Sequence, residues 1–381
     1  MSTLDSPDGP AEAASEDAGA DAFAEKVFMA VLGAQQIQAI ELGARLGWYE
    51  ALASAGGPIT AGELASRTGT NARYAREWLE HQAVCGYVTV DAAPEEGSTA
   101  PEDRRFTLPA AHAAVLADPD SVAFMTPIAR FVATTGRFVN RIADTYRTGG
   151  GLSWDDLGDD AREAQAAANR PLFLQRLGQE LLPAAPGLHA RLSYGPRRIA
   201  DVGCGYGWSA IGLARTYPEA VVDGYDIDEP SVVAARRNAA EAGVEDRVRF
   251  HVADGSALGT GDQAGAYDAV FAFECVHDMP DPVGVLAGVR RMLAPGGVVV
   301  VMDERTEEQF TAPAGEVEQL MYGYSLMCCL GDCMSHQPSA ATGTVMRPAT
   351  LAAYAREAGY GDFGVLPIED DFFRFYELSA G

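Results

Sequence analysis

A glycine-rich turn in Arg198–Gly207 carries the clearest chemical pattern in the sequence. The letters RIADVGCGYG describe a short apolar run that ends near Asp201, followed by glycines at alternate positions, Gly203, Gly205 and Gly207. Glycine permits a tight turn with positive φ and lets a ligand lie against bare backbone, and the helix expected next offers unpaired N–H groups. The pattern predicts a nucleotide-type cradle at the carboxyl end of a first parallel strand.

The strands expected after this turn also end beside acidic residues. The second predicted strand ends at Asp226, placed to accept both hydroxyls of a ribose, the third ends at Asp254, and the fourth is followed by Glu274. A Pro-Gly-Gly turn in Ala294–Gly297 then leads into an apolar fifth strand. Because strands and helices alternate throughout, we expect a parallel sheet with helices on both faces.

Together these motifs carry a family resemblance. The run DVGCGYG, the acid at Asp226, the ADG at Ala253–Gly255 and the APGG at Ala294–Gly297 resemble a class I S-adenosylmethionine-dependent methyltransferase over roughly the C-terminal half of the chain. The G-x-G-x-G spacing differs from the G-x-G-x-x-G of nicotinamide proteins, which makes a nicotinamide enzyme the weaker alternative. The resemblance implies an α/β, Rossmann-like fold with a mostly parallel seven-stranded sheet that ends in an antiparallel hairpin.

The resemblance also implies S-adenosyl-L-methionine as the cofactor and gives each cofactor-side residue a role. Asp201 and the three glycines match the loop that approaches the methionine moiety, although such an acid can instead only order the backbone. Asp226 matches the acid that binds the ribose, and Ile227 is placed to touch the adenine. The predicted cofactor-binding residues are Asp201, Gly203, Gly205, Gly207, Asp226, Ile227, Asp254, Gly255 and Phe273.

The acceptor side is expected at the loop after the fourth strand, which should face the transferred methyl group. His277 is a candidate general base, because neutral imidazole can take a proton from a hydroxyl near pH 7, and Asp278 or Glu274 would orient it. The sequence equally allows His277 to pack this loop or shape the pocket. Asp303 and Glu304, at the end of the fifth strand, hint at a cationic or hydrogen-bond-donating acceptor.

The N-terminal part of the chain predicts an α-rich module that resembles a winged helix. Thr60 and Glu63 form a capping-box pattern, Asn71 is placed to cap the next helix, and two strand-like runs, YVTVD and RRFTL, predict a hairpin. In small-molecule methyltransferases of similar layout this module serves dimerisation and closes the substrate pocket. The resemblance therefore implies a homodimer.

A DNA-binding role for this module is disfavoured. A recognition helix needs basic and amide groups that face the groove, whereas here Arg73 and Arg76 are offset by Glu77 and Glu80. The chain has a formal net charge of −26 and a single lysine, Lys26, so its surface should repel nucleic acids and acidic membranes. A winged-helix transcription regulator and a cofactor-binding protein without transfer activity remain the alternatives to an enzyme that acts on a small molecule.

Length and composition predict four regions. With 381 residues, the chain exceeds the usual size of a single domain. We expect a disordered acidic tail at 1–21, a winged-helix-like domain at 22–110, a helical connector at 111–192 and the methyltransferase domain at 193–381.

Localisation and metal content follow from what the sequence lacks. We find no apolar run of membrane-spanning length and no secretory signal, and so expect a cytoplasmic protein without a membrane partner. The six cysteines are expected to be reduced. Three of them, Cys328, Cys329 and Cys333, lie near His336, but their spacing matches no common zinc pattern, and no metal is expected.

Overall fold

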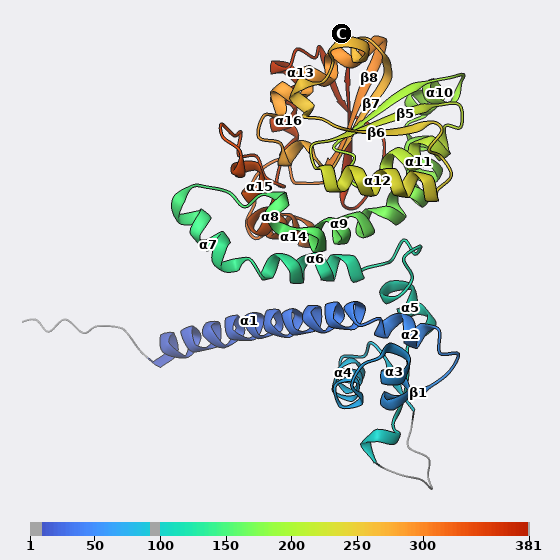
Figure 1. The fold of residues 1–381 in the computed structure, drawn as a ribbon. Helices are drawn as coiled ribbons and strands as arrows, with labels where there is room; N and C mark the ends of the chain where they lie inside the picture. Colours follow the sequence, from blue (N-terminus) through green and yellow to red (C-terminus); the bar gives the residue numbers. More distant parts are fainter. Residues whose placement is uncertain (1–9, 92–99, 380–381) are drawn as a thin grey trace, which may run out of the picture. The chain divides into compact units, whose positions relative to one another are not determined.

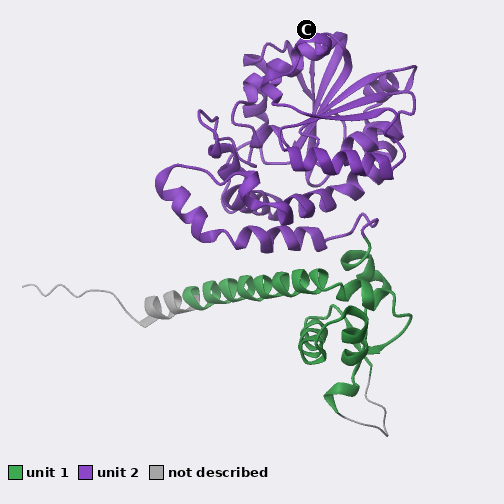
Figure 2. Ribbon diagram, in the orientation of Figure 1, with its two compact units in different colours: residues 1–118 green, residues 119–381 purple. Residues whose placement is uncertain are grey.

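The computed structural model describes residues 10–91 and 100–379, and the chain divides into two compact units, Met1–Asp118 and Pro119–Gly381 (Figure 2). The sequence places the end of the first domain at residue 110. The division lies later because helix α5 (Ala110–Leu116) packs against α2 (Trp48–Ala53) of the first unit. Most of the predicted connector, 111–192, therefore belongs to the second unit.

The first unit combines helices with a small antiparallel sheet of order β1-β3-β2 (Figure 1). The predicted hairpin corresponds to β2 and β3, and β1 is a third strand that the sequence analysis did not anticipate. The capping box at Thr60 and the cap at Asn71 are both present, as predicted. In chain order the elements are α1 (Pro10–Arg45), α2, β1 (Ile59–Thr60), α3 (Ala61–Thr68), α4 (Ala72–Val84), β2 (Thr89–Val90), η1 (Pro101–Asp103), β3 (Arg105–Thr107) and α5.

Helix α1 begins at Pro10, within the segment 1–21 that was predicted to be a disordered tail; residues 1–9 of that segment lie outside the described residues. Alanine, the residue with the highest helix propensity, is the commonest residue between Pro10 and Asp21. By length and composition alone, Gly19–Arg45 would also be long and apolar enough to cross a membrane, with 17% of the apolar window buried. This corrects the expectation that no segment reaches that length.

Aromatic side chains hold the first unit together. The rings of Trp48 and Trp78 lie 4.8 Å apart, and the Trp78 indole N–H donates to the carbonyl of Ala39 at 2.8 Å. The Tyr49 hydroxyl donates to the side-chain oxygen of Gln82 at 2.6 Å, and both residues are fully buried. These contacts join α1, α2 and α4 around one small core.

The second unit contains the larger sheet and its covering helices. Before the sheet come α6 (Thr126–Gly136), α7 (Val139–Thr148), α8 (Trp154–Leu157), α9 (Asp159–Pro171), the π-helical η2 (Leu172–Leu181), η3 (Leu182–Ala184) and α10 (Pro186–Ser193). The sheet region contains β4 (Arg198–Val202), α11 (Trp208–Thr216), β5 (Val221–Asp226), α12 (Glu229–Glu241), β6 (Val248–Val252), η4 (Gly255–Ala257), η5 (Gly261–Gln263), β7 (Tyr267–Phe273), η6 (Val276–Asp278), α13 (Pro282–Met292) and β8 (Leu293–Glu304). After β8 follow α14 (Glu316–Tyr324), η7 (Ser325–Cys329), α15 (Leu330–Ser335), α16 (Pro348–Glu357), β9 (Asp362–Val365) and β10 (Phe373–Ser379).

The seven-stranded sheet has the order β6-β5-β4-β7-β8-β10-β9. Strands β6, β5, β4, β7 and β8 run parallel, whereas β10 is antiparallel to both β8 and β9. The predicted α/β, mostly parallel sheet with a final antiparallel hairpin is confirmed. Strand β10 lies inside the sheet, between β8 and β9, rather than at its edge.

Alternate residues of the parallel strands enter two hydrophobic cores, one on each face of the sheet. Ile199 and Val222 face the core that is covered by η2, α10, α11 and α12, whereas Ala200 and Val299 face the core under α13 and α16. Helices therefore cover both faces (Figure 1). This burial fixes the register of the strands, because a shift by one residue would turn each apolar set to the opposite face.

Candidate functional site

The glycine turn between β4 and α11 has the backbone that its sequence predicts. Gly203, Gly205 and Gly207 all have positive φ, of 74°, 49° and 79°. A Cβ at Gly203 would lie 2.7 Å from the sulfur of Cys275, and one at Gly207 would lie 2.5 Å from the ring of Phe250. At Gly205 no atom lies within 4 Å of the position of such a Cβ. Side chains of the protein therefore pack against the backbone at Gly203 and Gly207, whereas the backbone at Gly205 has open space beside it.

Asp226, at the carboxyl end of β5, holds this turn in place. Its Oδ2 accepts the backbone N–H of Gly205 at 2.7 Å, and its Oδ1 accepts that of Asp228 at 2.9 Å. Burial raises the pKa of Asp226, and these N–H groups act in the opposite direction. Ile227, the next residue, is 67% exposed, and its contact with the adenine stays a prediction.

Asp201 lies behind the turn and is fully buried. Its Oδ2 accepts the hydroxyl hydrogen of Ser209 at 2.5 Å, and the N–H of Ala210 also bonds this carboxyl. Burial raises the pKa of Asp201 to about 7. Ser209 and Ala210 are both in the first turn of α11. These contacts favour the interpretation in which Asp201 orders the backbone of the turn and does not itself bind the cofactor.

The remaining predicted cofactor residues follow β6 and end β7. Asp254 is exposed, and its Oδ1 accepts the N–H and the hydroxyl of Ser256, each at 2.8 Å. A Cβ at Gly255 would lie 2.9 Å from the side chain of Val285 in α13. The side chain of Phe273 packs into the core, with its ring 5.2 Å from that of Phe173. Only the backbone of Phe273 is thus placed to line a ligand site.

His277 lies in the middle of a buried acidic cluster at the carboxyl ends of β7 and β8. Its Nδ1 is 3.0 Å from Oδ1 of Asp303 and 3.1 Å from Oε2 of Glu304, and its Nε2 is 3.3 Å from Oδ1 of Asp278. Although burial opposes it, these carboxylates raise the pKa of His277 well above its usual range. Both ring nitrogens face acids, so the predicted role as general base stays a prediction.

Glu274 completes the cluster from the end of β7. Its φ of 52° is positive, which is uncommon for a residue with a side chain. Burial, together with Glu304 and Asp303, raises the pKa of Glu274 well above its usual value, and its Oε1 has no hydrogen-bond partner. Burial likewise raises the pKa of Glu304 to about 7. The cluster therefore holds protons that exposed carboxylates would release.

A group of three aromatic side chains, each from a different helix, reaches the cluster through Tyr324. The ring of Phe131 in α6 is 5.9 Å from that of Tyr324 in α14 and 6.4 Å from that of Trp154 in α8. Burial raises the pKa of Tyr324 to about 12, with smaller contributions from Glu274, Cys329 and Glu304. An aromatic wall and a set of carboxylates are thus brought together from distant parts of the chain.

Comparisons with known proteins match both units. Residues 197–351 match a methyltransferase domain family, and residues 36–118 match an Rv2258c-like winged HTH domain. The 27-O-demethylrifamycin SV methyltransferase of Amycolatopsis mediterranei is 40% identical over 106 residues, which are 28% of this chain and 38% of that protein. The ubiquinone biosynthesis O-methyltransferase of Bordetella avium is 31% identical over 186 residues, 48% of this chain and 70% of that protein. The chain belongs to the class I S-adenosylmethionine-dependent methyltransferases.

Solved structures extend the fold of this methyltransferase to the whole chain. The mitomycin 7-O-methyltransferase MmcR superposes with a TM-score of 0.69 at 22% identity and covers 96% of this chain and 100% of its own. Human N-acetylserotonin methyltransferase, in complex with S-adenosylmethionine, superposes with a TM-score of 0.69 at 17% identity and covers 99% and 100%. At these identities the likeness supports the shared two-part fold.

The residues at the glycine turn fit the cofactor of the methyltransferase family. The open space at Gly205 leaves the backbone free for a ligand to approach. Asp226 already accepts one backbone N–H at each oxygen, and each carboxylate oxygen has a second lone pair for a ribose hydroxyl. The loop and the acid are thus compatible with S-adenosylmethionine.

Sequence reasoning missed Arg162 of α9. Its guanidinium donates to both oxygens of Asp228, at 2.9 and 2.8 Å, and also to Asp155 and Asp159, while the residue is only 4% exposed. This contact joins α9 to the residue that caps α12, two positions after Asp226. No local pattern around Arg162 indicates it, because its main partner lies far along the chain.

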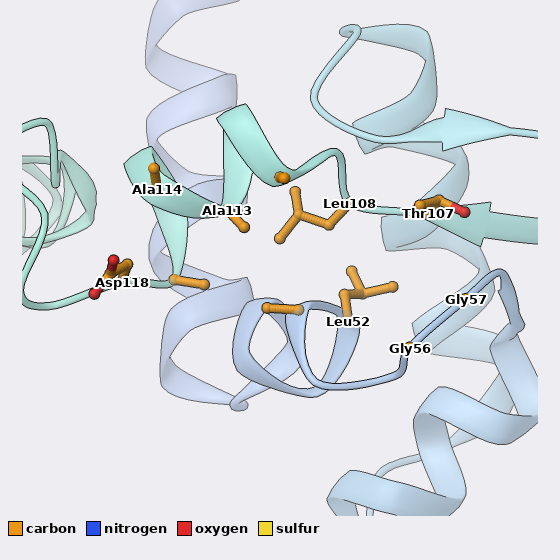
Figure 3. Close-up of a pocket in the computed structure, with 11 residues that line it drawn as sticks. Leu52, Gly56, Gly57, Thr107, Leu108, Ala113, Ala114 and Asp118 are labelled. Carbon is orange, nitrogen blue, oxygen red and sulfur yellow. The ribbon is translucent and has the colours of Figure 1, made fainter.

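The first unit has a hollow of its own, and none of these site residues lines it. It has a volume of about 510 Å³ and is lined by Leu52, Leu108 and small residues such as Gly56 and Ala113 (Figure 3). Asp118 is the one titratable side chain in this lining. The hollow therefore has none of the groups that methyl transfer needs.

Proposed function

We propose that this methyltransferase transfers the methyl group of S-adenosylmethionine to a small-molecule acceptor that binds beside Glu274, His277 and Tyr324. The observation that carries the proposal is the position of the bare turn at Gly205 and the carboxylate of Asp226 at the same edge of the sheet as the acidic cluster. Ligands of open α/β sheets bind at this carboxyl edge.

The residues of the chain serve mainly to position the reactants. When bound, the cofactor supplies an activated methyl group, so the protein has to align the acceptor, exclude water and manage the acceptor's proton. The aromatic side chains of Phe131, Trp154 and Tyr324 are suited to hold an acceptor ring and to keep the site dry. Oxygen, nitrogen and carbon acceptors are all compatible with this arrangement.

Calorimetric titration tests the cofactor part of the proposal. We expect S-adenosylmethionine and S-adenosylhomocysteine to bind and NAD not to bind. Asp226→Asn should weaken both interactions by about 10- to 100-fold, since a hydrogen bond to a charged group contributes roughly 1.5–3 kcal/mol. Asp246→Asn, at an exposed aspartate, is the matched control. Equal binding by wild type and Asp226→Asn would remove the ribose role.

Transfer itself is tested by mass spectrometry with a library of phenols, amines and activated carbon acids. Addition of one methyl group to a library member supports an enzyme. Tight cofactor binding without turnover on any acceptor would favour the alternative of a cofactor-binding protein without transfer activity.

We also propose that the chain forms a homodimer through α1. Its side chains include several large apolar residues that are exposed by 48% or more, among them Phe23, Phe28, Met29 and Val31. An exposed apolar surface of this kind supports a protein partner, and a second copy offers a matching helix. Sedimentation at two protein concentrations decides: a monomer at both would remove the dimer, and co-sedimentation with neutral lipid vesicles would favour a membrane instead.

We propose a cytoplasmic location and no function on nucleic acid. The charges around α4 support the second point. Arg73 forms an ion pair with Glu77 at 2.5 Å, and both residues are in α4. Arg76 of α4 lies 3.8 Å from Glu102, and Glu80 of α4 forms an ion pair with Arg104. Arginines that are engaged by acids present little positive charge to a phosphate backbone. A salt-sensitive gel shift with duplex DNA would overturn this part.

A further inference from the structure

The pair of carboxylates at Nδ1 of His277 is not explained by cofactor binding. Oδ1 of Asp303 and Oε2 of Glu304 approach this single nitrogen to 3.0 and 3.1 Å. The three residues are buried, with 1%, 1% and 7% of their surfaces exposed for His277, Asp303 and Glu304. They come from η6 and from the end of β8, whose positions the sheet fixes.

When Asp303 and Glu304 are both ionised, this arrangement is short of hydrogen-bond donors. A ring nitrogen carries at most one hydrogen, so Nδ1 can satisfy Asp303 or Glu304 but not both. Oδ2 of Asp303 and Oε2 of Glu304 accordingly receive no hydrogen bond. Within residues 10–91 and 100–379, His277 is the one cationic side chain that forms an ion pair with either carboxylate. Buried carboxylate oxygens without a partner are costly, and a bound cation would supply one.

We propose that Nδ1 of His277, Asp303 and Glu304 bind one divalent transition-metal ion. Their ligand atoms lie within 4.8 Å of one another. A metal ion at about 2.1 Å from two neighbouring ligand atoms separates those atoms by about 3.0–3.4 Å, in agreement with the distances at Nδ1. A metal would replace the single ring hydrogen and bind both carboxylates at once.

The other ring nitrogen faces a third carboxylate. A metal-bound histidine usually donates its second N–H to a carboxylate, which fixes the orientation of the ring. Here Nε2 lies 3.3 Å from Oδ1 of Asp278, within ion-pair distance, although this oxygen accepts no hydrogen bond in the structure without a metal. His277, Asp278 and Cys329 form a second group with suitable spacing. Asp278 and Cys329 are only partly buried. A metal ion at this second group would bind Nε2, the ring nitrogen that faces Asp278, and not Nδ1.

The donor set indicates which ion binds. One imidazole and two carboxylates suit Zn²⁺ or Mn²⁺ better than Mg²⁺, which prefers oxygen ligands and keeps its water. Our sequence analysis expected no metal, and it considered only the cluster of Cys328, Cys329, Cys333 and His336. The site proposed here uses different residues, which are brought together only by the fold.

A role in transfer rests on the proposed function. A metal ion at the carboxyl ends of β7 and β8 would bind and polarise an acceptor oxygen beside Glu274 and Tyr324. In that case His277 is a metal ligand and does not act as the general base. Metal binding itself does not depend on methyl transfer and is measured without cofactor or acceptor.

The test is titration of the metal-stripped, full-length protein with ZnCl2 and MnCl2, followed by calorimetry and by elemental analysis after gel filtration. We expect about one ion per chain in the wild type. Asp303→Asn and Glu304→Gln should each weaken binding by at least about tenfold, and Asp278→Asn by about 10–100-fold through the ring orientation. Asp246→Asn should bind like the wild type. Circular dichroism establishes that each variant is folded.

Cobalt substitution gives a readout that does not depend on affinity. Visible absorption of bound Co²⁺ should change in Glu304→Gln and stay unchanged in Cys329→Ser. A wild type that binds no ion would overturn the proposal, as would equal binding by Asp303→Asn and Glu304→Gln, or a spectrum that responds only to Cys329→Ser. S-adenosylhomocysteine titration of the same samples distinguishes a failed metal site from a failed cofactor site.

Discussion

Replacing Asp201 with asparagine tests whether the buried acid behind the glycine turn is protonated in the folded protein. Burial raises its pKa to about 7, from an ordinary value of 3.8. Between these values the folded state binds a proton that the unfolded state has released. The free energy of unfolding therefore falls as pH rises through this window, by about 1.36 kcal/mol per pH unit, and levels off above pH 7.

The magnitude follows from the width of the window. From pH 5 to pH 8 the wild type should lose about 2.7 kcal/mol through Asp201, the product of 1.36 kcal/mol and the two pH units between pH 5 and the pKa of about 7. Because the acid is half ionised at pH 7, a few tenths of this loss fall between pH 7 and pH 8. Asparagine does not titrate, so Asp201→Asn lacks this loss. Other groups, such as Glu304 and Asp332, titrate in both proteins and cancel in the difference between them.

The assay is urea unfolding of both proteins without cofactor, followed by circular dichroism at pH 5, 6, 7 and 8. The stability of the wild type relative to Asp201→Asn should fall by about 2.7 kcal/mol between pH 5 and pH 8, with most of the loss below pH 7. The same comparison with Asp246→Asn, at an exposed site, should be flat. A change below about 0.5 kcal/mol for Asp201→Asn would refute the reasoning, because the acid would then be ionised throughout this range.

Three further substitutions test packing and charge. Gly207→Ala should destabilise the fold by about 2 kcal/mol or more in thermal unfolding, because φ is 79° and the new Cβ would lie 2.5 Å from Phe250. Gly265→Ala is the control: φ is also positive there, but no atom is nearer than 4.0 Å to the new Cβ, so the cost should be about 1 kcal/mol. Arg162→Met should cost about 3–5 kcal/mol by urea unfolding because it leaves the partly buried Asp228 without its cationic partner, and adding Asp228→Asn should recover part of this loss. Tyr49→Phe should cost about 1–3 kcal/mol by removing the buried hydrogen bond to Gln82, and an unchanged melting temperature would contradict that contact.

Local signals account for the parts of the fold that sequence could predict. The cap at Thr60 depends on Glu63 three residues later, and the turn at Gly203–Gly207 depends on backbone conformations that glycine favours. The caps and the turn are each contained in a few consecutive residues. The parallel sheet is predicted by a longer pattern, the alternation of apolar strands with helices between Arg198 and Glu304.

Long-range contacts account for what the sequence could not predict. Strand β1 is only two residues long and exists because Ile59 pairs with Phe106. The surroundings of His277 depend on Asp303, Glu304 and Cys329, which come from other elements and carry no shared motif. The sequence analysis predicted disorder at 1–21 because this segment has few apolar residues to bury. Alanine favours a helix without burial, and α1 therefore begins earlier, at Pro10.

The place of β10 in the sheet has a consequence for synthesis of the protein. Phe373–Ser379 pairs with β8 along its length, and Arg374 lies opposite Asp303. On the ribosome, the glycine turn and the parallel strands emerge long before this segment, so β8 has an open edge until residues 373–379 have left the exit tunnel. Strand β8, which ends in Asp303 and Glu304, therefore gains its second neighbour only after the rest of the sheet has been made.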